Sequence, residues 1–345
     1  MDQKQKKIRS AVRRDHAETY LLISLVSFAV TVIATRVFLQ LTGFPQVGNS
    51  VLHIAHALWG GLLLFVAVLL PLALANRWAI QASAILGGIG IGLFIDEVGK
   101  FITQANDYFF PPALSIVYAF FLLTVLVYLY FRRPRQENPR KVMYHVLEGL
   151  QDALDGNLDQ KEAARIEAQL AIARSSRQPE ILSLAGAITY YMEQEKDHLL
   201  AAEPGIWKRF TKWIEEMGRR FGRNRHRVLI SVILFLWVAF VIGFIFVLLQ
   251  ENPNLDLQVA QWKIPLIVIQ ALSGVFMIVA LIAWLSGKEK SGLNIAVAGF
   301  LLSLVALQTL YFYLSQFSAL TTTLIQFTFL LIMLAYSRWY LNEGN

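Results

Sequence analysis

The sequence predicts an all-α polytopic integral membrane protein of about eight transmembrane helices, arranged as four, a cytoplasmic helical insert, and four more. Of the 345 residues, 56% are hydrophobic and only 16% are charged, whereas a soluble domain carries about 25% charged residues. Several apolar runs are long enough to cross a hydrocarbon core of roughly 30 Å. A long polar stretch, 132–226, separates two groups of these runs.

Four spans are predicted in the first half. Residues 1–19 form a polar, basic N-terminal segment, and the membrane part of this half is 20–131. The first run is too long for a signal-peptide core, so it is expected to be retained as a helix. In "NDYFFPP", 106–112, aromatic residues anchor the chain at an interface and prolines begin the last helix of this half. The predicted spans are 20–42, 51–75, 79–103 and 110–131.

The polar stretch 132–226 has the composition of a helical domain. Its four helical segments are separated by Gly, Pro and Asn. Asp159 and Glu162 have the spacing of an N-cap residue with a reciprocal carboxylate at the third helical position. The predicted helices of this insert are 139–154, 160–174, 179–195 and 205–221.

The last insert helix has the pattern of a helix lying on a membrane surface. Its apolar residues recur at three- and four-residue spacing, and its basic residues fall mostly elsewhere. Such a helix is expected to bind the cytoplasmic leaflet and its anionic lipid; the alternative is packing on its own domain. The predicted membrane-facing residues are Trp207, Phe210, Trp213, Ile214, Met217 and Phe221.

Four further spans are predicted near 227–250, 262–286, 292–315 and 317–341, followed by a short tail, 342–345. They carry few ionisable groups. Their polar residues either wall a cavity or hydrogen-bond between helices. These residues are Gln270, Asn294, Gln308, Tyr311, Tyr313, Thr321, Thr322, Thr323 and Gln326.

The distribution of basic residues predicts the orientation. With the N-terminus inside, all of the 31 Lys and Arg residues except Arg36, Lys100 and Lys263 fall in cytoplasmic segments. The positive-inside rule therefore predicts a plasma-membrane (cell inner membrane) protein with both termini cytoplasmic. The net charge of +7 does not indicate a nucleic-acid partner, and the expected partner is the lipid bilayer. The absence of cysteine excludes disulfides and thiolate metal sites.

Six ionisable residues are predicted to lie at one height in the outer part of the membrane. The second and third spans must be antiparallel neighbours, because only a short turn around Arg77 joins them. Folding the chain there places His56 level with residue 98, and folding the first two spans about residue 46 places Arg36 level with residue 57. The predicted site consists of Arg36, His53, His56, Asp96, Glu97 and Lys100.

Helical spacing suggests how these residues would meet. Gly88, Gly92, Asp96 and Lys100 recur every four residues, so they share one face. If this face meets Gly60 of the second span, His53 and His56 approach Asp96. Glu97 would then face the first span and Arg36.

The leading functional hypothesis is binding or conduction of an ion, a proton, or a polar or anionic ligand at this charged site. Charges inside a membrane are costly and usually face a cavity or the protein interior. Histidine and carboxylate groups can exchange protons near neutral pH. Arg36 and Lys100 could instead receive an anionic head group.

A metal-dependent membrane enzyme is the first alternative. His53, His56, Asp96 and Glu97 could hold zinc or iron, with a leftover carboxylate as general base. In His53, His56 and Asp96 the chain resembles part of the three-histidine, one-aspartate zinc sites of adiponectin-receptor-like and ceramidase-like membrane hydrolases. The sequence offers no third histidine within a span. No further residue role is therefore carried over.

The second alternative is a scaffold or sensor that acts through the cytoplasmic insert. In that case the charges only brace the helices, with Asp96 paired to Lys100 and Glu97 paired to Arg36. The sequence leaves open whether the protein is an enzyme.

Overall fold

The structure, a computed structural model, confirms the all-α polytopic membrane fold. Eight helices among the described residues are long and apolar enough to cross a membrane. The described residues form no β-strand. The chain divides into two compact units, residues 1–95 with 123–205 and residues 96–122 with 206–345. The described residues are 11–43, 55–105, 107–108, 110–133, 138–156, 158–194, 216, 218, 220–250 and 257–341.

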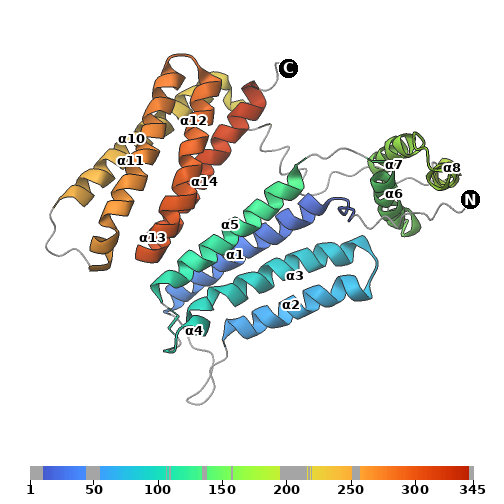
Figure 1. Ribbon diagram of the computed structural model, residues 1–345, viewed down its shortest axis with the longest axis horizontal. Coiled ribbons are helices and arrows are strands. Elements are labelled where there is room, and N and C mark those ends of the chain that lie inside the picture. Colours follow the sequence, from blue (N-terminus) through green and yellow to red (C-terminus); the bar gives the residue numbers. More distant parts are fainter. Residues whose placement is uncertain are drawn as a thin grey trace, which may run out of the picture. The chain divides into compact units, whose positions relative to one another are not determined.

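The first unit contains α1 (Ala17–Thr42), α2 (His56–Ala73), most of α3 (Arg77–Asp96) and the second half of α5 (Pro111–Arg132) (Figure 1). Glycines let α3 approach two neighbours closely. A Cβ atom on Gly88 would collide with the Ser24 carbonyl oxygen of α1. A Cβ atom on Gly90 would lie 2.8 Å from the Gly60 carbonyl oxygen of α2.

The expected meeting of Gly88 and Gly92 with Gly60 is therefore wrong. Gly88 and Gly92 pack on α1, and Gly60 packs on Gly90. Residues two positions apart project about 200° apart around a helix. Gly88 and Gly90 therefore lie on opposite sides of α3. The glycine contacts therefore give no reason for His53 and His56 to approach Asp96.

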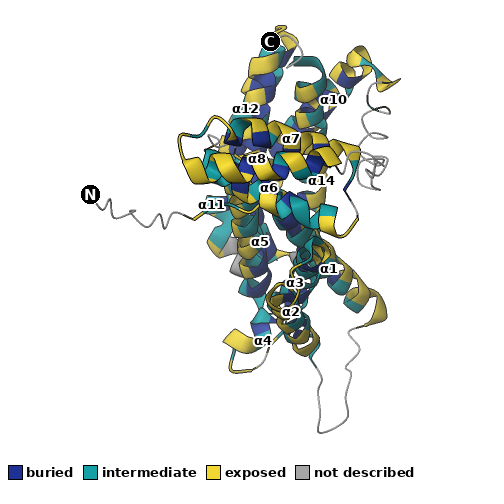
Figure 2. Ribbon diagram, turned by 90° about the vertical axis from the view of Figure 1, so that its right-hand side faces the viewer, coloured by how far each residue is buried: buried dark blue, intermediate teal, exposed yellow. Residues whose placement is uncertain are grey.

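The insert begins with three helices, α6 (Pro139–Leu154), α7 (Gln160–Ala173) and α8 (Pro179–Gln194), within a residue of the predicted bounds. Asp159 caps α7, since its carboxylate accepts a hydrogen bond from the Glu162 amide at 2.8 Å. Buried and exposed residues alternate along the three helices (Figure 2). Their shared core consists of Val142, Met143, Val146, Leu158, Ala163, Ile166, Leu170, Ala173, Ala185, Ile188 and Met192.

Ion pairs bind this insert to the membrane helices of its unit. The Arg77 guanidinium, at the start of α3, donates to the carboxylates of Asp152 and Glu162. Glu162 therefore makes two contacts: its amide bonds to the cap residue of α7, and its carboxylate accepts from Arg77. Just before α1, the Asp15 carboxylate accepts from Arg165 of α7 at 2.6 Å. The insert thus contacts the ends of α1 and α3 that the sequence predicts to be cytoplasmic.

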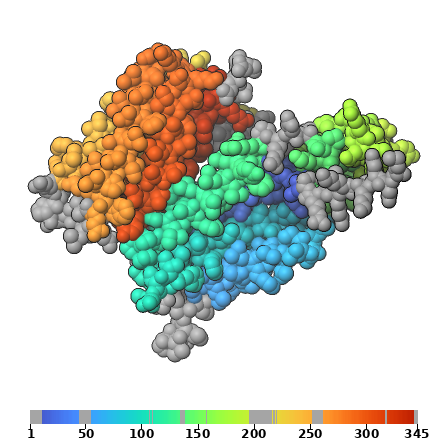
Figure 3. Space-filling view, in the orientation of Figure 1, coloured from blue at the N-terminus to red at the C-terminus, as the bar shows by residue number. Residues whose placement is uncertain are grey.

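The second unit is built on α10 (Arg223–Leu249), α11 (Leu257–Leu285), α12 (Glu289–Leu302) and α14 (Gln316–Tyr336). The seventh span is not a uniform α-helix. A π-helical segment, η2 (Ser303–Leu307), joins α12 to α13 (Gln308–Leu314), and a second one, η3 (Ser337–Leu341), follows α14. On the face in Figure 3, side chains of these helices (orange to red) cover the interior of the unit.

Large apolar side chains pack inside this unit and also remain exposed on its surface. Its core includes Trp237, Met277, Phe300 and Tyr336. Along the same helices other apolar side chains stay uncovered, for example Ile264, which is 74% exposed. Continuous apolar exposure on helices of this length fits a lipid environment.

Candidate functional site

The third predicted span is broken at its two carboxylates. The sequence predicts one helix over 79–103, but α3 ends at Asp96 and a short helix, α4 (Val98–Ile102), follows Glu97. Glu97 has φ −91° and ψ 12°, outside the helical region. Asp96 is 0% exposed and Glu97 is 1% exposed. Two adjacent buried carboxylates therefore occupy a helix break.

Both carboxylates have partners on the segment that follows. The Tyr108 hydroxyl donates to Asp96 Oδ2 at 2.6 Å, and Lys100 Nζ donates to Glu97 Oε1 at 2.7 Å. Lys100 Nζ also lies 5.4 Å from the centre of the Tyr108 ring. Hydrogen bonds to ionised carboxylates are short and strong, so these contacts offset part of the cost of burial. We call these four side chains, Asp96, Glu97, Lys100 and Tyr108, the charged cluster; they belong to the second unit.

The backbone after α4 folds back to bring Tyr108 to Asp96. The Thr103 hydroxyl donates to the Gly99 carbonyl at 2.7 Å and accepts from the Asp107 amide at 2.8 Å. A Cβ atom on Gly99 would lie 2.6 Å from the Asp107 carbonyl oxygen, so only glycine allows this approach. Sequence reasoning assigned Tyr108 to an interfacial anchor. No local pattern indicates a hydrogen bond between residues twelve positions apart.

The other predicted site residues lie in the first unit or outside the described ranges. Arg36 is buried in α1 at 3% exposure, and His56 is half-buried as the first residue of α2. His53 lies outside the described residues. Glu97 and Lys100 contact each other directly. The gathering of all six residues stays a prediction.

The predicted metal set also stays a prediction. Within the described ranges, no three His, Asp or Glu side chains lie close enough together to hold a metal ion. The set of His53, His56, Asp96 and Glu97 includes a residue outside those ranges.

The predicted membrane-surface helix lies mostly outside the described residues. Of its six apolar residues only Phe221 is described, and its ring centre lies 4.9 Å from that of His226. Gly222, at φ 79°, separates this segment from α10. That backbone conformation favours glycine. The lipid contact of the remaining residues stays a prediction.

The first half of α5 ties the charged cluster to the helices of the second unit. The Tyr118 hydroxyl donates to the Leu304 carbonyl at 2.7 Å, and the Ser115 hydroxyl donates to the Thr309 carbonyl at 2.8 Å. Leu304 lies in the π-helical segment η2, so Tyr118 bonds to the irregular stretch of the seventh span.

Comparison of the chain with protein-family models, curated proteins and solved structures found no match.

Proposed function

We propose that this membrane protein binds protons at the Asp96–Glu97 pair and conducts them across the bilayer. The observation that carries the proposal is the burial of two adjacent carboxylates, 0% and 1% exposed, at a break in a membrane-spanning helix. Ionisable residues in such positions are expensive to insert and are usually kept for function. Broken helices recur at the ion sites of transporters.

The contacts around the pair favour a proton over an anionic ligand. Lys100, the cation nearest the pair along the chain, already binds Glu97 at 2.7 Å. An incoming anion would have to displace that carboxylate. A proton can instead bind Asp96 or Glu97 directly, and the Tyr108 hydroxyl can accept or donate a hydrogen bond as Asp96 changes state.

The setting of this activity is the cell inner membrane, with the insert and both termini in the cytoplasm. The distribution of Lys and Arg supports this orientation. The basic residues around the start of α10, including the exposed Arg220 and Arg225, would face anionic lipid at the cytoplasmic surface.

Reconstituted liposomes test the proposal. Purified protein is placed in vesicles containing a pH-sensitive dye, and a potassium gradient with valinomycin sets the membrane potential. We expect potential-driven proton movement with the native chain. The variants Asp96→Asn and Glu97→Gln should each reduce the rate to that of protein-free vesicles.

The control is Glu180→Gln, which removes an exposed carboxylate from α8 of the insert and should leave the rate unchanged. A native chain that conducts no faster than protein-free vesicles overturns the proposal. So does a native rate that persists in both carboxylate variants. In the latter case the pair would act only as a brace.

The ion pairs between the insert and the membrane helices of the first unit favour a second role, in which the insert regulates the membrane part. Arg77 joins α3 to both α6 and α7 through Asp152 and Glu162. In the same vesicles, Arg77→Met should then change the proton rate although it alters no residue of the charged cluster. An unchanged rate in a folded Arg77→Met protein contradicts this role.

A further inference from the structure

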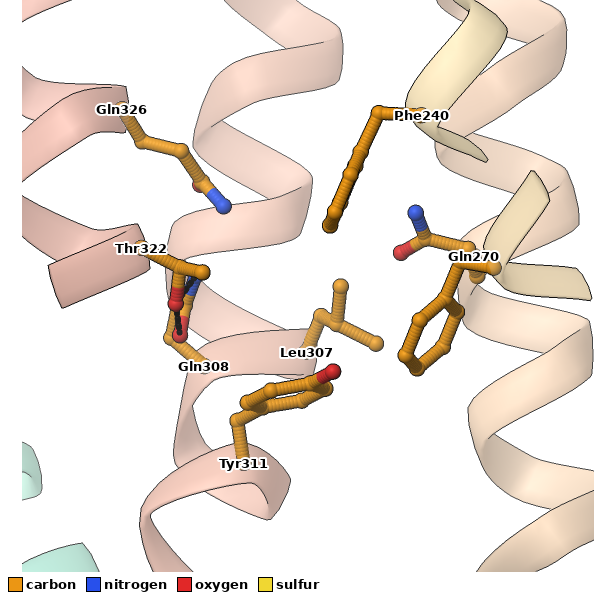
Figure 4. Close-up of a pocket in the computed structure, with 8 residues that line it drawn as sticks. Phe240, Gln270, Leu307, Gln308, Tyr311, Thr322 and Gln326 are labelled. Atoms are coloured by element: carbon orange, nitrogen blue, oxygen red, sulfur yellow. Dashed lines mark hydrogen bonds between the residues drawn. The ribbon is translucent and has the colours of Figure 1, made fainter. Parts of the chain in front are cut away.

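A second polar site lies in the interior of the second unit, separate from the charged cluster. Four helical segments, α10, η2 with α13, α11 and α14, close around a small cavity (Figure 4). Its volume of about 10 Å³ suits one particle the size of a water molecule. The lining residues are Phe240, Phe244, Gln270, Leu307, Gln308, Tyr311, Thr322 and Gln326.

Two of the three glutamines in this lining have unused hydrogen-bonding capacity. Gln308 and Thr322 bond to each other, at 3.1 and 3.2 Å. In contrast, Oε1 of Gln270 and Oε1 of Gln326 are buried without a hydrogen-bond partner among the described residues. Both side chains are 1% exposed, and their amides point toward the cavity in Figure 4. Buried polar atoms are nearly always bonded to protein or to ordered water, so both oxygens need a partner that the described side chains do not supply.

The backbone next to the cavity is also irregular. The π-helical segment Ser303–Leu307 ends at a lining residue and leads directly into Gln308 and Tyr311. Ser303 Oγ, at the start of that segment, is another buried polar atom without a partner among the described residues. Single π-helical turns are rare in proteins, and those that occur often lie at functional sites.

The chemistry of the lining selects the ligand class. Among the described residues no carboxylate lines the cavity, so a divalent cation would lack the charged ligands it normally takes. The described part of the chain also brings no Lys, Arg or His to the lining, so an anion would lack a counter-charge. Amide and hydroxyl oxygens can replace the hydration shell of a monovalent cation. The rings of Phe240, Phe244 and Tyr311 add faces that attract a cation.

We propose that the cavity lined by Gln270, Gln308, Tyr311 and Gln326 binds one small monovalent cation through neutral oxygens. The site is independent of the proton site proposed at Asp96 and Glu97. It would hold the bundle helices together around the ion.

Thermal unfolding of the purified, detergent-solubilised protein tests the site. Midpoints are measured at constant ionic strength and pH while choline chloride is replaced by NaCl, KCl or NH₄Cl. We expect at least one of the three small cations to raise the midpoint along a saturating curve, by about 2 °C or more at saturation. Choline is too large to enter the cavity and supplies the baseline.

Three variants locate the effect. Gln270→Met and Gln326→Met keep the side-chain length but remove the amide oxygen, and each should abolish the cation-dependent shift. The matched control is Asn294→Leu, which removes an exposed amide from α12 of the same unit and should keep the shift. Asp96→Asn should also keep it, which separates this site from the proton site.

Gln326→Glu provides a readout that does not depend on loss of stability. A carboxylate in the lining should strengthen cation binding, so the shift should saturate at a lower salt concentration than in the native chain. Equal midpoints in choline and in all three small cations overturn the proposal, because the cavity would then hold only water. A native-like shift in both Gln→Met variants overturns it as well.

Discussion

Gly60 and Gly61 are neighbours in α2, yet their surroundings differ sharply. A Cβ atom on Gly60 would lie 2.7 Å from the backbone nitrogen of Phe94, whereas a Cβ atom on Gly61 would meet nothing within 4 Å. Gly60 therefore sets the distance between α2 and α3 in the first unit. At Gly61 no neighbouring atom requires the absence of a side chain.

This difference gives a matched pair of substitutions. Gly60→Ala should lower the free energy of unfolding by about 1–3 kcal/mol, because backbone atoms of α3 must move to admit the methyl group. Gly61→Ala should be neutral or slightly stabilising, because alanine favours the helix. Thermal unfolding in detergent measures both. Equal midpoints for the two variants would contradict the close approach of α2 and α3.

His16 is a second residue whose environment carries a consequence. It precedes α1 with a left-handed φ of 54°, and its ring lies beside Asp15 and Arg165. Burial lowers the pKa of His16 from its ordinary value of 6.5, opposed by Asp15 and reinforced by Arg165. A lowered histidine pKa means that the folded state disfavours the protonated ring. The stabilisation is present above pH 6.5 and is lost as the pH falls through the lowered value.

We therefore expect acidification from pH 7.5 to 5.5 to lower the unfolding midpoint of the native chain more than that of His16→Asn. Asparagine tolerates the left-handed conformation and carries no titratable group. The difference between the two proteins isolates the contribution of His16 from that of the carboxylates. An identical pH response in both proteins would refute this account.

At the scale of elements, the docking of the insert depends on one arginine. The Arg77 side chain is 12% exposed and joins Asp152 and Glu162, which are 20% and 23% exposed. Burial is the main cause that raises the pKa of Asp152, with Arg77 opposing it. Arg77 therefore favours the ionised form of the Asp152 carboxylate.

Arg77→Met should accordingly destabilise the first unit by about 1–3 kcal/mol, since two partly buried carboxylates lose their partner. Limited proteolysis should cleave the insert faster in this variant. Lys161→Met is the control, because it removes an exposed cation from α7. Adding Asp152→Asn and Glu162→Gln should recover part of the loss. No recovery would indicate that the arginine acts through packing alone.

At the scale of the whole molecule, the absence of cysteine makes the predicted orientation easy to test. Ala105→Cys places a thiol on the exposed turn after α4, and Ser175→Cys places one on the exposed turn between α7 and α8. A membrane-impermeant maleimide applied to intact cells should label the first variant and not the second. Lysed cells should label both. If intact cells labelled only Ser175→Cys, the true orientation would be the reverse of the predicted one.

The sequence predicts the helices well because their signals are local. The bounds of α6, α7 and α8 follow from composition, prolines and the Asp159 cap, all within a few residues of the helix they define. The eight spans follow from apolar length alone. The break at Glu97 escapes such reasoning, because the apolar pattern continues to residue 103 while the loop after it folds back on Gly99.

The sequence by itself determined the membrane class, the position of the spans, the helical insert and the unusual charges at Asp96, Glu97 and Lys100. Hydrophobic length, capping and charge are properties of neighbouring residues, so they can be read along the chain. The tertiary structure alone decided that Gly88 faces α1 and Gly90 faces α2. It also decided that Tyr108 binds Asp96 and that two glutamines with unbonded oxygens line one cavity. These contacts join residues that are distant in sequence, and only the packing of helices selects them.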